Sequence, residues 1–110
     1  MSEFRHHQPR LLAIDDSILI HRLMKEHLRH EDVELQGAMA GGEGVELAAT
    51  LRPDCILLDL DLPDISGFDV LRALHAQSST RDIPVIVVSC HDQTADKVRA
   101  LDLGAIDFVS

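Results

Sequence analysis

The sequence contains no tryptophan or tyrosine and only three phenylalanines among its 110 residues. Proteins that bind single-stranded nucleic acid stack the bases on aromatic side chains, so this mode of binding is not expected here. Basic residues are also few: 10 lysines and arginines stand against 19 aspartates and glutamates, and the formal net charge is -9. Because a nucleic-acid-binding surface is normally basic, we expect no direct contact of this chain with nucleic acid.

Cysteines and long apolar runs are scarce as well. The two cysteines, Cys55 and Cys90, are too few for a disulfide framework. At opposite ends of neighbouring parallel strands they would lie roughly 13 Å apart, too far for a disulfide bond. No apolar run approaches the ~20 residues of a membrane span, and the polar residues 1–10 do not resemble a signal peptide. These absences predict a cytoplasmic protein that has no membrane contact.

What the sequence does have is 45% apolar residues, enough for one domain with a single core. Short apolar runs alternate with segments of helical period. Ser66 is the expected N-cap of the third helix, with Asp69 in its first turn, and Gly104 is the expected C-cap of the fourth. We expect strands over 10–14, 33–39, 55–59, 84–89 and 105–109, and helices over 17–30, 42–52, 66–77 and 92–104.

Three of these strands are apolar on both faces, which is typical of a parallel sheet with helices on both sides. The sequence therefore predicts an α/β fold, with residues 1–9 as an N-terminal tail and 10–110 as the domain. In such sheets the ligand lies beyond the carboxyl ends of the strands, where the strand order reverses. That rule selects residues at strand ends: Asp15, Asp16, Asp59 and Ser89.

Three carboxylates at neighbouring strand ends repel one another, so their pKa values rise unless a cation offsets the charge. Mg²⁺ prefers oxygen ligands and would serve this purpose. A carboxylate beside Mg²⁺ can accept a phosphoryl group, and a serine hydroxyl can bond one of the phosphoryl oxygens. In the stretch CILLDLDLPD (55–64), either Asp59 or Asp61 could play the acceptor role on this reasoning alone.

Four segments together resemble the receiver domain of two-component response regulators, the family that includes the chemotaxis response regulator. They are LLAIDDS (11–17), ILLDLDLPDISG (56–67), VIVVSCHD (85–92) and LGAIDFVS (103–110). The resemblance extends over nearly the whole chain from Leu11. It implies a doubly wound parallel five-stranded sheet in the flavodoxin-like order 2-1-3-4-5.

The resemblance also assigns a phosphoryl acceptor and a metal site. Asp59 matches the family's phosphoacceptor. Asp16 is implied to ligate Mg²⁺ directly and Asp15 through a water molecule. The backbone carbonyl of Asp61 is implied as a further ligand, and Asp59 itself completes the set.

Two further positions match the family's switch residues: Ser89 its hydroxyl and Phe108 its aromatic ring. Positions 61, 90 and 91 fall where the family varies the lifetime of the phosphate. The implied function is to take a phosphoryl group from a sensor histidine kinase and to switch an output domain or partner protein. The domain is not expected to be an enzyme.

The chain departs from the family at its end. A receiver normally continues past DFVS with a lysine, a proline and a fifth helix, whereas this sequence stops at Ser110. Lys97 is no substitute for the lysine, because it lies within the fourth predicted helix. We therefore expect a C-terminally incomplete receiver whose last helix is missing. Five strands with four helices would leave Ile106 or Phe108 partly uncovered, which favours a homodimer, strand exchange or aggregation.

Two alternatives stay open. DLDLP (59–63) also resembles the D-x-D motif of haloacid-dehalogenase-type phosphatases, with Asp59 as nucleophile and Asp61 as acid/base. That family normally has Thr or Val where Pro63 stands, and the acidic pair at 15–16 would have no role. The second alternative is a receiver-like interaction module that works without phosphate.

Several other polar residues are interpreted as structural. Asp64 is taken as a solvated loop residue, and Gly67 as a backbone requirement near a helix start. His21, His27 and His30 on the first helix are taken as surface residues, because no further ligand completes a metal set there.

Overall fold

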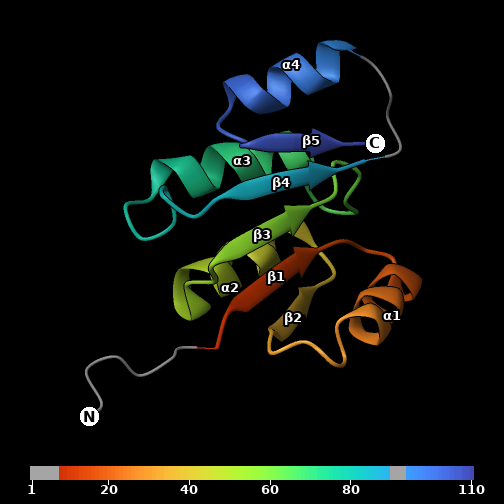
Figure 1. Ribbon diagram of the computed structural model, residues 1–110. Coiled ribbons are helices and arrows are strands. Elements are labelled where there is room, and N and C mark those ends of the chain that lie inside the picture. The colour runs from red at the N-terminus through yellow and green to blue at the C-terminus, as the bar shows by residue number, and fades with distance from the viewer. Residues whose placement is uncertain (1–7, 90–93) are drawn as a thin grey trace.

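The computed structural model describes residues 8–89 and 94–110, which form a parallel sheet flanked by helices (Figure 1). The strands run in the order β2-β1-β3-β4-β5, and each neighbouring pair is parallel. This confirms the doubly wound fold and its strand order. The elements are β1 (Arg10–Ile14), α1 (Ile18–His27), β2 (Glu34–Ala38), α2 (Gly41–Leu51), β3 (Cys55–Leu58), α3 (Gly67–Ala76), β4 (Val85–Val88), α4 (Thr94–Asp102) and β5 (Asp107–Val109).

The predicted elements all occur, with bounds that differ from the expected ones by a few residues. Cys90 and His91 lie outside the described residues, so the expectations for them remain predictions. The same holds for residues 1–7 of the expected N-terminal tail. None of the helices in the described part combines the length and hydrophobicity that a membrane span needs.

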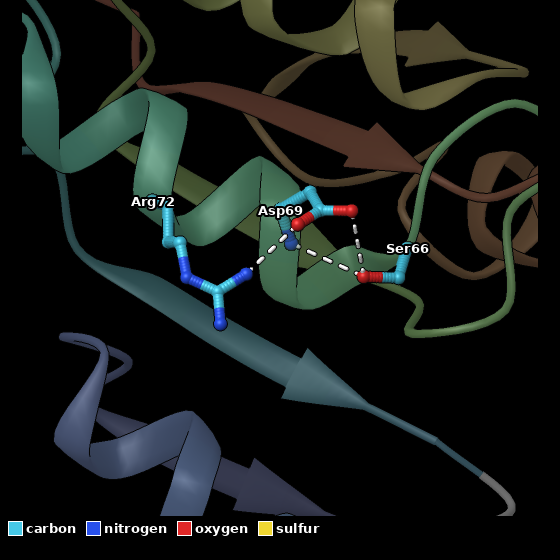
Figure 2. A network of polar contacts seen from close by, with 3 residues as sticks. All are labelled: Ser66, Asp69 and Arg72. Atoms are coloured by element: carbon cyan, nitrogen blue, oxygen red, sulfur yellow. Dashed lines mark hydrogen bonds and ion pairs between the residues drawn. The ribbon is translucent and has the colours of Figure 1, made fainter.

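The start of α3 is fixed by a small polar network, which Figure 2 shows from close by. The Ser66 hydroxyl accepts a hydrogen bond from the Asp69 backbone N–H at 3.2 Å and donates one to the Asp69 carboxylate, also at 3.2 Å. Arg72 bonds the same carboxylate at 2.8 Å. The predicted N-cap is therefore confirmed, and it defines the residue at which the loop after β3 ends and α3 begins. Gly104 follows α4 with a φ of +110°, which confirms the predicted C-cap.

One face of the sheet is covered by helices over its central strands. In Figure 1, α2 and α3 lie behind the strands. Register partners in a parallel sheet point to the same face, so alternate residues of β1, β3, β4 and β5 face the side on which these helices lie. We call this the covered face. It holds the buried residues Leu12, Ile14, Ile56, Leu58, Val85, Val87 and Phe108, which pack with Val70, Leu71 and Leu74 of α3.

The opposite face, which we call the open face, is covered mainly by α1 and only in part. None of the residues of α1 is fully buried, and Leu19 and Leu23 are 61% and 48% exposed. An apolar cavity of about 180 Å³ lies between α1 and the sheet, next to Leu57. Helices on both faces were predicted, and within the described residues the second layer is incomplete.

Ile106 or Phe108 was predicted to be partly uncovered, and the structure confirms this for Ile106. Ile106 is 61% exposed, as expected. Phe108 is buried, because it pairs with Val87 and points to the covered face. The exposed apolar residues near β5 are therefore Ile106 and Val109 rather than the phenylalanine.

Candidate functional site

The carboxyl ends of β1 and β3 bring three carboxylates together. Ile14 and Leu58 are register partners, so the residues that follow them leave the sheet side by side. The Asp59 N–H donates to the Ile14 carbonyl at 2.9 Å, which holds the two strand ends in contact. One carboxylate oxygen from each of Asp15, Asp16 and Asp59 lies within 4.8 Å of the others. The structure thus assembles the predicted acidic cluster.

Backbone donors orient two of these carboxylates. Asp15 Oδ1 accepts a hydrogen bond from the Ser17 N–H at 2.8 Å, in the turn that leads into α1. Asp59 Oδ1 accepts one from the Asp61 N–H at 3.2 Å. Asp15 and Asp59 are half-buried, whereas Asp16 is exposed. The cluster therefore lies at the protein surface, and backbone hydrogen bonds hold two of its three carboxylates in place.

The electrostatics of the cluster favour a cation. Partial burial raises the pKa of the Asp59 carboxyl, and the N–H of Asp61 opposes this by stabilising the charged form. The nearby charges of Asp15, Asp61 and Asp16 raise the pKa further. A divalent ion would relieve this repulsion, and closely spaced carboxylate oxygens are the donors that Mg²⁺ prefers. The residues present therefore fit a magnesium ion.

The cluster opens into a surface hollow of about 220 Å³. Ser89 lies at the end of β4, is 5% exposed, and also lines the hollow. The predicted strand-end residues Asp15, Asp16, Asp59 and Ser89 therefore meet at one place. Among the described residues that line the hollow there is no lysine, and Lys97 lies on α4, as predicted.

Two predicted site residues lie outside the hollow. The Asp61 side chain is exposed, and its backbone N–H is what contacts Asp59. Phe108 is buried on the covered face, one strand beyond β4. The structure therefore links Asp61 to the cluster through the backbone and leaves Phe108 at a distance from it.

The loop after β3 closes on itself at Gly67. The Gly67 N–H donates to the Leu60 carbonyl at 2.9 Å, and a Cβ at this position would lie 2.7 Å from the Asp59 carbonyl oxygen. A larger residue would push that carbonyl away and move Asp59 with it. The backbone requirement predicted for Gly67 is confirmed.

Asp64 has a structural role that sequence reasoning missed. It is exposed on the loop, as expected, but its two carboxylate oxygens accept hydrogen bonds from the Gly41 and Gly42 N–H groups at 2.8 and 2.9 Å. These donors are the first residues of α2, and they lower the pKa of Asp64 to about 2. Ala40 occupies the N-cap position of α2 without a capping side chain. That missing cap was the available signal, because a helix start needs an acceptor from somewhere.

Comparison with known proteins shows where this chain has relatives. The family model described as the response regulator receiver domain matches residues 11–110. The transcriptional regulator RpaA of Synechocystis is 39% identical over 102 residues, which cover 93% of this chain and 42% of RpaA. The chain spans less than half the length of the curated relatives named among its matches.

Solved structures agree with this result. The Vibrio cholerae chemotaxis protein CheY4 superposes with a TM-score of 0.86 at 26% identity, covering 94% of this chain and 86% of CheY4. The Mn²⁺-bound response regulator Rcp1 superposes with a TM-score of 0.81, also at 26% identity, covering 93% of this chain and 80% of Rcp1. The phosphatase alternative is not favoured, because the family match and these neighbours are receivers.

Proposed function

Because the chain belongs to the response regulator receiver domain family, we propose that its Asp59 accepts a phosphoryl group from the phosphohistidine of a sensor histidine kinase. The observation that carries this assignment is the meeting of Asp15, Asp16, Asp59 and Ser89 in one surface hollow. Asp59 is half-buried and directly follows the central strand β3. Asp61, the other candidate of the D-x-D pair, has an exposed side chain outside the lining.

One oxygen of the Asp59 carboxylate is available for the transfer. Asp59 Oδ1 is engaged by the Asp61 N–H, so we assign Oδ2 as the attacking oxygen. As the new P–O bond forms, the P–N bond to the kinase histidine breaks, and the imidazole keeps the electron pair and takes up a proton. The product is an acyl phosphate on Asp59. Ser89 lines the same hollow, and its hydroxyl would bond one of the phosphoryl oxygens.

Magnesium is the cofactor that this donor set supports. When bound, Mg²⁺ would supply the positive charge that the carboxylates and the incoming phosphoryl group require. Asp16 would hold it directly, Asp15 through a water molecule, and Asp59 and the Asp61 carbonyl would complete the protein ligands. One oxygen from each of the three carboxylates lies within 4.8 Å of the others, which supports this arrangement, and a similar response regulator, Rcp1, has a Mn²⁺-bound form.

The signal would leave the site through the last strands. The Ser89 N–H donates to the Val109 carbonyl at 3.0 Å, so β4 and β5 are tied together directly beside the hollow. Phe108 is the neighbouring aromatic residue whose side chain would change position in response. The receiving element would be an output domain or a partner protein. We further propose that the domain acts in the cytoplasm, has no enzymatic turnover of its own and does not touch nucleic acid.

Acetyl phosphate and intact-mass spectrometry test the assignment. With Mg²⁺ present, we expect the wild-type protein to gain about 80 Da, the mass of one phosphoryl group, and Asp59→Asn to gain none. The 110-residue chain is compared with a version to which a lysine and a fifth helix have been added after Ser110. Asp61→Asn is the matched control and should still be modified. An equal mass gain in wild type and Asp59→Asn would refute the assignment.

A further inference from the structure

His21 connects the exposed helix α1 to the acidic cluster. Its Nε2 lies 2.7 Å from the backbone carbonyl oxygen of Asp15. A carbonyl oxygen can only accept, so Nε2 carries a proton and donates it in this bond. The ring is half-buried, although α1 fully buries none of its residues. His21 is therefore not the simple surface residue that the sequence suggested.

The hydrogen bond from His21 completes the set of contacts that hold Asp15 in place. The Asp15 N–H donates to the Ala38 carbonyl of β2 at 3.0 Å, and its side chain accepts from the Ser17 N–H at 2.8 Å. With His21 on the carbonyl oxygen, the N–H, the C=O and the carboxylate of Asp15 each have a partner. The peptide that joins Asp15 to Asp16 is consequently held on one side by the imidazole.

Gly37 provides the space in which the imidazole lies. It belongs to the edge strand β2 and pairs with Ala13, so it faces the same side of the sheet as α1. A Cβ at position 37 would lie 2.7 Å from His21 Nδ1 and 2.9 Å from Cε1. Any side chain there would force the ring out of the position from which it bonds Asp15.

We propose that His21 is a positioning residue for the metal site and that Gly37 is the position that admits it. By holding the Asp15 carbonyl, His21 fixes the turn that aims the Asp15 and Asp16 carboxylates at Asp59. Residues that orient metal ligands in this way set metal affinity without touching the ion. This inference rests on the proposed function, because it requires that the cluster binds a cation.

Isothermal titration calorimetry with Mg²⁺ on the 110-residue chain separates the effect of the hydrogen bond that His21 donates from the effect of its packing. His21→Phe keeps a ring of similar shape over Gly37 and removes the donor, and we expect its Mg²⁺ affinity to fall by about 10-fold. His21→Gln places an amide N–H at a similar distance from the backbone and should recover most of that loss. His27→Phe, an exposed residue on the same helix, is the control and should bind as wild type does. Thermal unfolding of each variant checks that it is folded.

A double-mutant cycle tests the role of Gly37. Gly37→Ala should weaken Mg²⁺ binding by a similar factor in the wild-type background and have little further effect in a His21→Ala background, where no ring remains to be displaced. Wild-type affinity in His21→Phe, or equal effects of Gly37→Ala in both backgrounds, would overturn the positioning role and leave Asp59 as acceptor intact. A wild-type chain that binds no Mg²⁺ would overturn the metal site itself and this inference with it.

Discussion

The two faces of the sheet receive alternate residues of the same strands, yet they are covered very differently. On the covered face, Ile56 and Leu58 of β3 are completely buried beneath α2 and α3. On the open face, Leu57 between them is half-buried beside a cavity under α1. Equal hydrophobicity along a strand therefore does not mean equal contribution to stability. The covered face forms the core, and the open face presents apolar surface that remains to be covered.

The functional site draws on both faces. The Asp59 loop is tied to the covered side, because Asp64 bonds the start of α2. The Asp15–Asp16 turn is tied to the open side, because His21 of α1 bonds the Asp15 carbonyl. The acidic cluster thus joins a firmly packed half to a loosely packed half. We expect substitutions on the two sides to separate folding stability from site geometry.

The largest effect should come from truncating the covered face. Leu58→Ala removes a fully buried side chain, and we expect the free energy of unfolding to fall by about 2–5 kcal/mol. Leu57→Ala, the adjacent residue of the same type, should cost about 1 kcal/mol, because the wild-type side chain is only half-buried. Urea denaturation measures both. Equal losses would show that the two faces are equally packed.

The β5 edge of the sheet should drive self-association. Apolar residues beside the edge strand β5, such as Ile106 and Val109, are exposed, and covering one isoleucine is worth about 1.5–3 kcal/mol. Sedimentation velocity should show a dimer that weakens in Ile106→Lys and strengthens with salt, because salt screens the repulsion between chains of net charge -9. A version extended by a fifth helix should associate less. A strictly monomeric 110-residue chain, as stable as the extended one, would contradict this prediction.

The acidic cluster should make the chain less stable at neutral pH. Burial and neighbouring carboxylates raise the pKa of Asp59, so the folded state binds more protons than the unfolded state between the two pKa values. Stability therefore falls as pH rises through that window, and the penalty is fully present above it. Without metal, Asp59→Asn should unfold at a higher temperature than wild type at pH 7, and the difference should vanish near pH 3. Added Mg²⁺ should stabilise the wild type more than Asp59→Asn.

The smallest expected effect concerns Asp64, whose pKa is shifted in the opposite direction to that of Asp59. Its pKa is lowered to about 2 from the ordinary 3.8, so its stabilising contribution is complete above pH 4 and is lost as pH falls towards 2. Asp64→Ala should lower the melting temperature at pH 7 and leave it nearly unchanged at pH 2. Asp82→Ala, at another exposed loop aspartate, is the control and should have little effect at either pH. A loss in Asp64→Ala that does not depend on pH would argue against the capping role.

Much of the fold and part of the site could be predicted from local sequence. Runs that are apolar on both faces indicate buried parallel strands, and the carboxyl ends of such strands are where ligands bind. That reasoning selected Asp15, Asp16, Asp59 and Ser89, which the structure brings into one hollow. It succeeded because parallel pairing places the ends of successive strands at one edge of the sheet.

Tertiary structure decided what depends on residues far apart in the chain. Asp64 caps a helix that begins 23 residues earlier, and His21 lies over Gly37 on a strand that its own helix precedes. No local pattern distinguishes these two residues from solvated ones. The partners of Asp64 are backbone N–H groups at the start of α2, and those of His21 are the Asp15 carbonyl and the backbone at Gly37. These groups become neighbours only when the sheet and its helices pack. The sequence by itself thus determined the buried parallel strands and the carboxylates at their ends, while packing between distant segments determined how those carboxylates are held.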